Sequence, residues 1–178
     1  LSTLQTVGNL SGGVERSASQ TVTVLSAGLI EAVQLNFANA TGHPVGPLVL
    51  ELRDLVGSLP GNTTLAVGVA NLSDARTGGW VTFTFATGVQ AAVNQKFALV
   101  LSSPGALDNE VWEWRAHNGV STDPYTAGEA FVSTNGSGQG PWVAQTNVDM
   151  AFRVLSAVPD PGYFSGYLWP IGAVPVGG

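Results

Sequence analysis

Two histidines and a few carboxylates are the side chains of this sequence that catalysis could use. His43 lies in a Gly-His-Pro turn and His117 follows a predicted strand, and neither belongs to a metal-binding pattern such as His-Glu-x-x-His. Neither a Gly-x-Ser-x-Gly nucleophile turn nor a phosphate-binding glycine loop followed by lysine occurs. Glu110 and Glu113 are three residues apart, so on a strand they point to opposite faces and cannot flank one glycosidic bond. We therefore expect a protein that is not an enzyme.

Aromatic residues suggest a different chemistry, the stacking of flat rings on sugar faces. Trp112 and Trp114 are separated by one residue, so they project from the same face of a predicted strand. We expect a glycan site formed by Trp112, Trp114, Arg115, His117, Asn118, Tyr125 and Trp142. The alternative is that the two tryptophans of the strand belong to the core, because large aromatics dominate core burial. For Trp80, which follows two glycines, we expect packing in the core or at its rim.

Loop oxygens indicate a possible calcium site, the one cofactor that the sequence suggests. Hard cations bind several oxygen ligands supplied by loops. Asp108, Asn109, Glu110 and Asp123 are near enough in sequence to act together across one loop region. No EF-hand spacing is present, and the alternative is that these residues are solvated acids of surface turns.

The elements that must position these residues follow a period of two. In the segment 48–54, Leu48, Leu50 and Leu52 share one face, which is typical of a strand with one buried side. The same alternation predicts strands at 31–37, 48–54, 80–85, 96–101 and 148–154, with weaker candidates at 20–25, 64–70, 111–116, 129–134 and 142–146. Turn sequences rich in Gly, Pro and Asn separate these runs. Single short turns of helix fit at 71–76 and 88–95.

This pattern predicts an all-β fold, an antiparallel two-sheet β-sandwich of jelly-roll type with extended terminal arms. Residues 20–155 form the predicted sandwich, and residues 1–19 form an N-terminal arm or first strand region. Residues 156–178 combine four prolines and five glycines with four aromatics, which excludes a helix or a central strand. This C-terminal segment either packs on its own sandwich or docks on a neighbouring subunit as an arm, with Tyr163, Phe164, Tyr167 and Trp169 as its contacts.

The charge balance excludes several partners. Six basic against twelve acidic residues give a net charge of −6, and the basic residues never cluster, so we expect no nucleic-acid partner. Every apolar run is interrupted well before the ~20 residues that a membrane helix needs, so we expect no membrane insertion. The absence of cysteine removes disulfides and thiolate metal sites.

The order of motifs resembles a known group of modules. A Val-Gln-Leu-Asn-Phe strand is followed by Gly-Pro-Leu-Val-Leu-Glu-Leu-Arg-Asp, Gly-Gly-Trp-Val-Thr-Phe-Thr-Phe, Lys-Phe-Ala-Leu-Val-Leu-Ser-Ser, a Trp-x-Trp strand and Asp-Met-Ala-Phe-Arg-Val. Over roughly residues 15–155 this resembles the jelly-roll β-sandwich modules of bacterial surface or exported proteins and of phage virion (spike or decoration) proteins, which are similar in shape to carbohydrate-binding modules. The resemblance implies a non-catalytic domain.

Two functions are consistent with these observations. The first is a structural and adhesion module, displayed in a virion or surface assembly and anchored through its terminal arm, with other protein subunits as partners and a homo-oligomeric state. The second is a free carbohydrate-binding module that recognises a polysaccharide through aromatic residues. Both place the protein outside the cell or on the virion surface.

Overall fold

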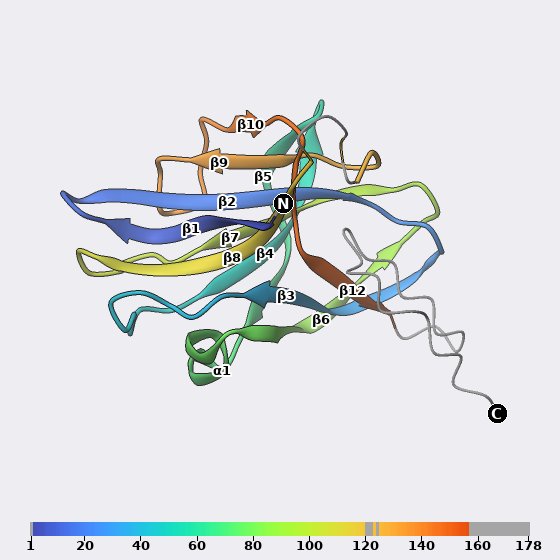
Figure 1. Cartoon of the computed structure of the whole chain (residues 1–178). Coiled ribbons are helices and arrows are strands. Elements are labelled where there is room, and N and C mark those ends of the chain that lie inside the picture. The colour runs from blue at the N-terminus through green and yellow to red at the C-terminus, as the bar shows by residue number, and fades with distance from the viewer. Residues whose placement is uncertain (1, 120–122, 124, 157–178) are drawn as a thin grey trace.

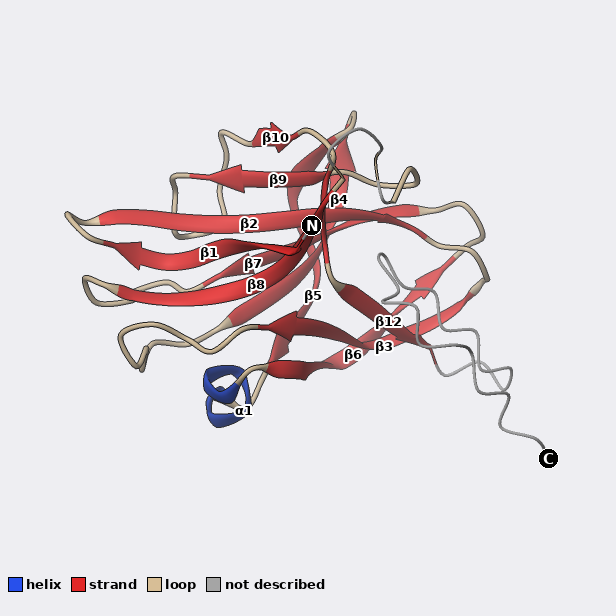
Figure 2. Cartoon of the chain, in the orientation of Figure 1, coloured by secondary structure: helices blue, strands red, loops and turns tan. Residues whose placement is uncertain are grey.

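The alternating sequence folds into antiparallel strands throughout (Figure 2). The computed structural model describes residues 2–119, 123 and 125–156. Within these residues the elements are β1 (Ser2–Leu10), β2 (Val14–Thr23), β3 (Gly28–Phe37), β4 (Val49–Val56), β5 (Leu59–Val69), α1 (Leu72–Thr77), β6 (Gly79–Ala91), β7 (Lys96–Ser102), β8 (Glu110–Asn118), β9 (Ala130–Ser133), β10 (Val143–Gln145), β11 (Val148–Met150) and β12 (Phe152–Ser156). The predicted all-β antiparallel fold is confirmed.

The strands pair in nested order: two consecutive strands form the innermost pair, and each further pair joins the strand before this set to the strand after it. β4 pairs with β5, β3 with β6, β2 with β7 and β1 with β8. This nesting is the jelly-roll order, and it produces two groups of four strands, β1-β8-β3-β6 and β5-β4-β7-β2, with β9 and β10 added beside β2 (Figure 1). The two groups are also joined to each other, because β1 and β2 form a hairpin and β5 meets β6 through two residue pairs. They therefore form one continuous twelve-stranded sheet.

The predicted strand 148–154 is divided in two. β8 and β3 pair only at Trp114 and Phe37 and then diverge, and the segment β11–β12 fills the gap between them. At its midpoint, Ala151 donates its N–H to the Arg115 carbonyl over 2.9 Å and accepts from the Asn36 N–H over 3.2 Å. The alternation still holds on both sides of this break, since Met150, Phe152 and Val154 are all buried.

Of residues 2–19, expected as an arm or first strand region, residues 2–10 and 14–19 are strand residues of the sheet, and residues 11–13 form the turn between them. β1 pairs with β8 over eight residue pairs, and β2 lies between β7 and β9. β2 shows little alternation because both of its faces are covered: Ser17, Ser19 and Thr21 are buried together with Ala18 and Val22. Polar side chains on this strand bond to neighbouring backbone, as Ser17 does to the Asn135 carbonyl over 2.7 Å. These residues therefore pair with strands of the region predicted as the sandwich.

The short helix predicted at 71–76 is confirmed as α1, whose first turn is capped by the Asn71 side chain accepting from the Ser73 N–H. The helical turn predicted at 88–95 is wrong. Residues 88–91 are the end of β6, where Val89 and Ala91 pair with β3, and a turn closed by Gln95 and Ala92 follows. The register of the β3–β6 pairing shifts between Ile30 and Ala32. Because of this irregularity, the paired segment of β6 does not alternate regularly between apolar and polar residues.

Candidate functional site

The two tryptophans expected to form a glycan platform lie in the core. Trp112 and Trp114 are both 0% exposed. Their ring N–H groups are satisfied inside the protein: Trp112 donates to the Ser103 hydroxyl over 3.2 Å, and Trp114 donates to the Ala151 carbonyl over 2.9 Å. The alternative of core packing is therefore the one that the structure shows, and neither ring can stack on a surface ligand.

The remaining residues of that predicted site are dispersed. Arg115 is exposed on the outer face of β8, and its Nε donates to the Phe37 carbonyl over 3.0 Å. His117 and Asn118 follow on the same strand, opposite Asp149 and Val148 of β11. Tyr125 packs edge-on against Phe152 with ring centres 5.5 Å apart. Trp142 is partly buried in the turn between β9 and β10.

The four predicted calcium ligands are not brought together. Asp108 and Asn109 lie just before β8 and Glu110 begins it, and Asp108 accepts from the Gly13 N–H over 3.3 Å. Asp123 lies beyond the other end of β8, where it accepts from the Tyr125 N–H over 2.9 Å. A nine-residue strand spans about 30 Å, so one ion cannot bind both ends. Across residues 2–119, 123 and 125–156, no group of three or more His, Cys, Asp or Glu side chains could hold a metal ion.

The predicted contacts of the C-terminal arm, Tyr163, Phe164, Tyr167 and Trp169, lie outside the described residues.

A surface that the sequence reading did not single out lies across β3, β6, β8 and β12. We call it the Trp80 face and define it by Trp80, Arg153, Arg115, Gln34, Asn36 and Thr82. The Arg153 guanidinium lies over the Trp80 ring, with its central carbon 3.9 Å from the ring centre. Gln34 pairs with Arg153 of β12 on one side and with Thr82 of β6 on the other, where its side-chain amide donates to the Thr82 hydroxyl over 3.0 Å. A cation–π contact of this kind contributes about 0.5–1 kcal/mol at an exposed site and holds the guanidinium flat.

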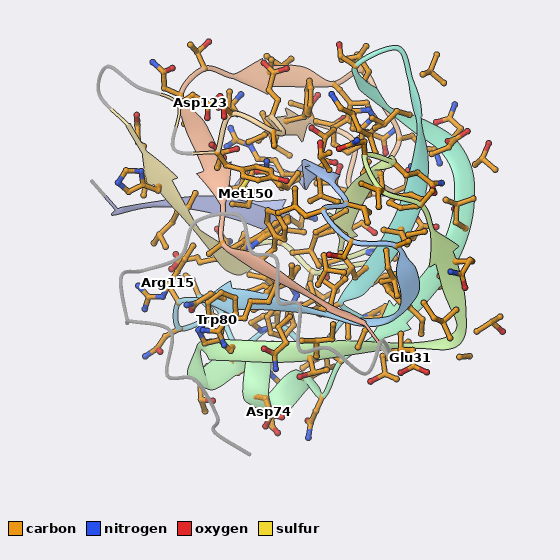
Figure 3. The ribbon with its side chains drawn as sticks, turned by 90° about the vertical axis from the view of Figure 1, so that its right-hand side faces the viewer. Glu31, Asp74, Trp80, Arg115, Asp123 and Met150 are labelled. Atoms are coloured by element: carbon orange, nitrogen blue, oxygen red, sulfur yellow. The ribbon has the colours of Figure 1, made fainter. Side chains whose placement is uncertain are left out.

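Arg115 reaches the same face from β8. The carbonyl that its Nε contacts belongs to Phe37, which pairs with Gly79, the residue before Trp80. Arg115 and Trp80 accordingly lie close together in Figure 3, with Asp123 well apart from both. Among the described residues, the one ion pair joins Arg53 and Glu51, so neither Arg115 nor Arg153 is paired with a described carboxylate.

A second candidate site is a pocket of about 290 Å³ beside β11. Its lining is polar and acidic, and comprises Asp123, Gly128, Glu129, Gln145, Thr146, Asn147, Val148 and Asp149. Asp149 is buried and accepts two hydrogen bonds, from the Gln20 side-chain amide over 2.8 Å and from the Tyr125 N–H over 2.9 Å. Gln20 also accepts from the Met150 N–H over 2.8 Å, so this amide links β2 to β11 across the core.

Burial, and after it the adjacent Asp123 carboxyl group, raises the pKa of Asp149 to about 8. The hydrogen bonds from Gln20 and Tyr125 act in the opposite direction. Burial also raises the pKa of the Tyr125 phenol, whose oxygen accepts from the Thr23 N–H over 3.1 Å. The pKa of His117, opposite Asp149, is lowered by partial burial. The pocket thus holds a buried carboxyl group, that of Asp149, whose pKa lies near 8.

A third feature is an apolar row on β5. Leu65, Val67 and Val69 alternate with the buried Ala66 and are 41%, 46% and 70% exposed. The strand is also open along one edge, since its pairing with β6 is limited to Gly68 and Val69. On the neighbouring strand β4 the outer face is covered: Arg53 is 2% exposed and donates to the Gly138 carbonyl over 2.7 Å. The loop that contains Gly138 covers β4 but leaves Leu65, Val67 and Val69 of β5 exposed.

The sequence contains a pattern that indicates the Trp80 face. The alternation that buries Val81, Phe83 and Phe85 necessarily turns Trp80 and Thr82 outward. In the same way, the burial of Val33 and Leu35 turns Gln34 outward. The position of Arg153 above the ring had no local signal, because it depends on the pairing of β12 with β3.

No protein-family model, curated protein or solved structure matches this chain. The resemblance to jelly-roll modules of surface and virion proteins stays a prediction. In the part of the chain that the structure describes, no helix combines the length and the apolar character needed to cross a membrane.

Proposed function

We propose that this protein is a non-catalytic structural and adhesion module that associates with a second copy of itself through β5, as a displayed component of a virion or surface assembly. The observation that carries the proposal is the apolar row of Leu65, Val67 and Val69 beside the open edge of the same strand. An open edge offers backbone N–H and C=O groups to another strand, and natural proteins usually block such edges with charges or coverings.

The composition of β5 supports association with an identical strand. No charged residue occurs between Leu59 and Val69, although the chain as a whole has a net charge of −6. Two carboxylates of β4 contact β5: Glu51 is paired with Arg53 and accepts from the Thr64 hydroxyl over 2.9 Å, and Asp54 accepts from the Thr63 N–H over 3.1 Å. Both lie on the β4 side of β5, away from its open edge. Two copies can therefore approach along this edge without placing like charges opposite each other.

A two-fold axis would make the contact self-complementary. In an antiparallel pair of β5 strands centred on Ala66, Leu65 of one copy faces Val67 of the other, and the converse pair repeats the contact. Each such apolar cross-strand pair contributes about 0.2–1 kcal/mol, in addition to the backbone hydrogen bonds. The closed symmetry of this arrangement limits the assembly to a dimer at this edge.

Sedimentation velocity of the full chain tests the proposal. We expect a species of twice the 18.3 kDa chain mass that dissociates on dilution. Val67→Lys should give the monomer, because it places a charge in the middle of the row. Val93→Lys is the matched control, since Val93 is also exposed, at 54%, but lies in the turn after β6, and this variant should remain dimeric. A wild-type protein that stays monomeric, or equal dissociation of both variants, would refute association through β5.

The C-terminal segment is proposed as a separate contact, through which the module is anchored to a scaffold protein outside the cell or on a virion. Its support is the sequence alone, namely the four aromatics among prolines and glycines. Deleting 160–178 should then leave the β5 dimer intact and abolish incorporation into the assembly. If the deletion abolishes the dimer and Val67→Lys does not, the segment carries the self-association in place of β5.

A further inference from the structure

We propose that the Trp80 face binds an acidic polysaccharide, one whose sugar rings carry carboxylate groups. This site is independent of the β5 contact, because it is built from β3, β6, β8 and β12.

The first argument is charge. Arg115 and Arg153 are two of only six basic residues in the chain, and both lie on this face without a described carboxylate partner. The nearest acid on β8, Glu113, is two residues from Arg115 and is engaged with the Thr41 hydroxyl over 3.3 Å. Guanidinium groups bind carboxylates through two parallel N–H···O bonds, so two guanidinium groups without a described carboxylate partner favour an anionic ligand.

The second argument is preorganisation. The Trp80 ring holds the Arg153 guanidinium flat at 3.9 Å, so its N–H edge is presented without the loss of side-chain freedom that a mobile arginine undergoes on binding. The Nε of Arg115 is already bonded to the Phe37 carbonyl over 3.0 Å, which fixes the direction of its remaining N–H groups.

The third argument is the polar neutral surface between the cations. Gln34 and Asn36 of β3 and Thr82 of β6 point outward, and their amide and hydroxyl groups can donate to and accept from sugar hydroxyls. Neighbouring strands are about 4.8 Å apart, a spacing comparable with the length of one sugar ring. The face therefore offers successive polar contacts across the strands. A nucleic acid would require many more cations than two.

Affinity electrophoresis of the full chain in gels containing polygalacturonate tests this site, with neutral dextran gels as reference. We expect polygalacturonate, and not dextran, to retard the protein. Arg153→Gln and Arg115→Gln should each weaken retention about tenfold, as expected for loss of a hydrogen bond to a charged group. Arg16→Gln is the matched control, since it removes the same charge from an exposed position on β2 and should retain binding.

Trp80→Ala should also weaken binding, whereas Trp80→Phe, which keeps a ring beneath Arg153, should retain most of it. Three results would overturn the proposal: no retardation of the intact protein by polygalacturonate, equal retardation by dextran, or an equal loss of affinity in Arg16→Gln. Circular dichroism of each variant distinguishes loss of the site from loss of the fold.

Discussion

Asp149 is a buried side chain whose protonation changes on folding. Its pKa is raised from 3.8 to about 8 by burial and by the Asp123 carboxyl group. Between these two values the folded protein holds a proton that the unfolded chain releases, so stability falls as pH rises through this window. The free energy of unfolding should decrease by up to about 1.4 kcal/mol per pH unit from this group, and the loss is complete above the folded pKa.

Asp149→Asn should remove this part of the pH dependence, since an amide cannot ionise. Its oxygen can accept from Gln20 as the carboxyl does now. Urea unfolding at a series of pH values between 4 and 8.5 measures the effect, and the difference between wild type and variant should change steadily across the window, in favour of the variant at the alkaline end. Asp74→Asn, which changes an exposed carboxylate of α1, should follow the wild type. Parallel curves for wild type and Asp149→Asn would contradict the raised pKa of Asp149.

At this scale, sequence reasoning left two environments open for Trp112 and Trp114, a glycan platform and the core, and the structure shows the core. Trp112 and Trp114 share a face, as predicted, but that face is the buried one. Spacing reveals which residues lie together and does not reveal which side is covered. For Trp80 the buried neighbours Val81 and Phe83 did provide that information, because they fix the phase of the alternation.

At the scale of elements, the strands with apolar alternation or a continuous apolar run were predicted well, and the polar strand β1 was not. β4 and β7 were expected at 48–54 and 96–101 and are found at Val49–Val56 and Lys96–Ser102. β1 was missed as a distinct strand because its segment is polar and rich in small residues. Its place is determined by pairing with β8, more than 100 residues away, and no local pattern encodes that contact.

Gly8 shows how closely β1 approaches β8. Its φ is +125°, which L residues rarely adopt, and an added Cβ would clash with the Glu110 carbonyl oxygen. We expect Gly8→Ala to lower the free energy of unfolding by about 2–4 kcal/mol, from backbone strain combined with displacement of β8. Urea denaturation measures the loss.

Gly12→Ala provides the control for this prediction. Gly12 also has a positive φ, +83°, but an added Cβ there meets nothing within 4 Å. This variant should therefore lose only about 1 kcal/mol, the cost of the backbone conformation alone. Equal losses for the two variants would show that the contact of β1 with β8 is not tight.

At the scale of the whole molecule, alternation and turn spacing were sufficient to predict an all-β antiparallel fold. They could not predict that the two groups of strands join into one sheet, since the β5–β6 contact rests on Gly68 and Val69 alone. Nor could they show that β5 stays uncovered, because the loop that covers its neighbour β4 is brought there by the Arg53–Gly138 hydrogen bond. The proposed dimer thus depends on a surface that only the assembled molecule reveals.

The absence of cysteine from the chain allows a direct measurement of this central claim. Single cysteines introduced as Leu65→Cys, Val67→Cys and Val69→Cys, with Val93→Cys as a reference, can be oxidised and the disulfide-linked dimer quantified. Two-fold pairing of β5 places residue 65 of one copy opposite residue 67 of the other, so an equimolar mixture of Leu65→Cys and Val67→Cys should cross-link efficiently. Each variant alone, Val69→Cys and Val93→Cys should give lower yields, because a disulfide requires Cα atoms within about 7 Å. Cross-linking of the mixture no greater than that of Val93→Cys would contradict the account.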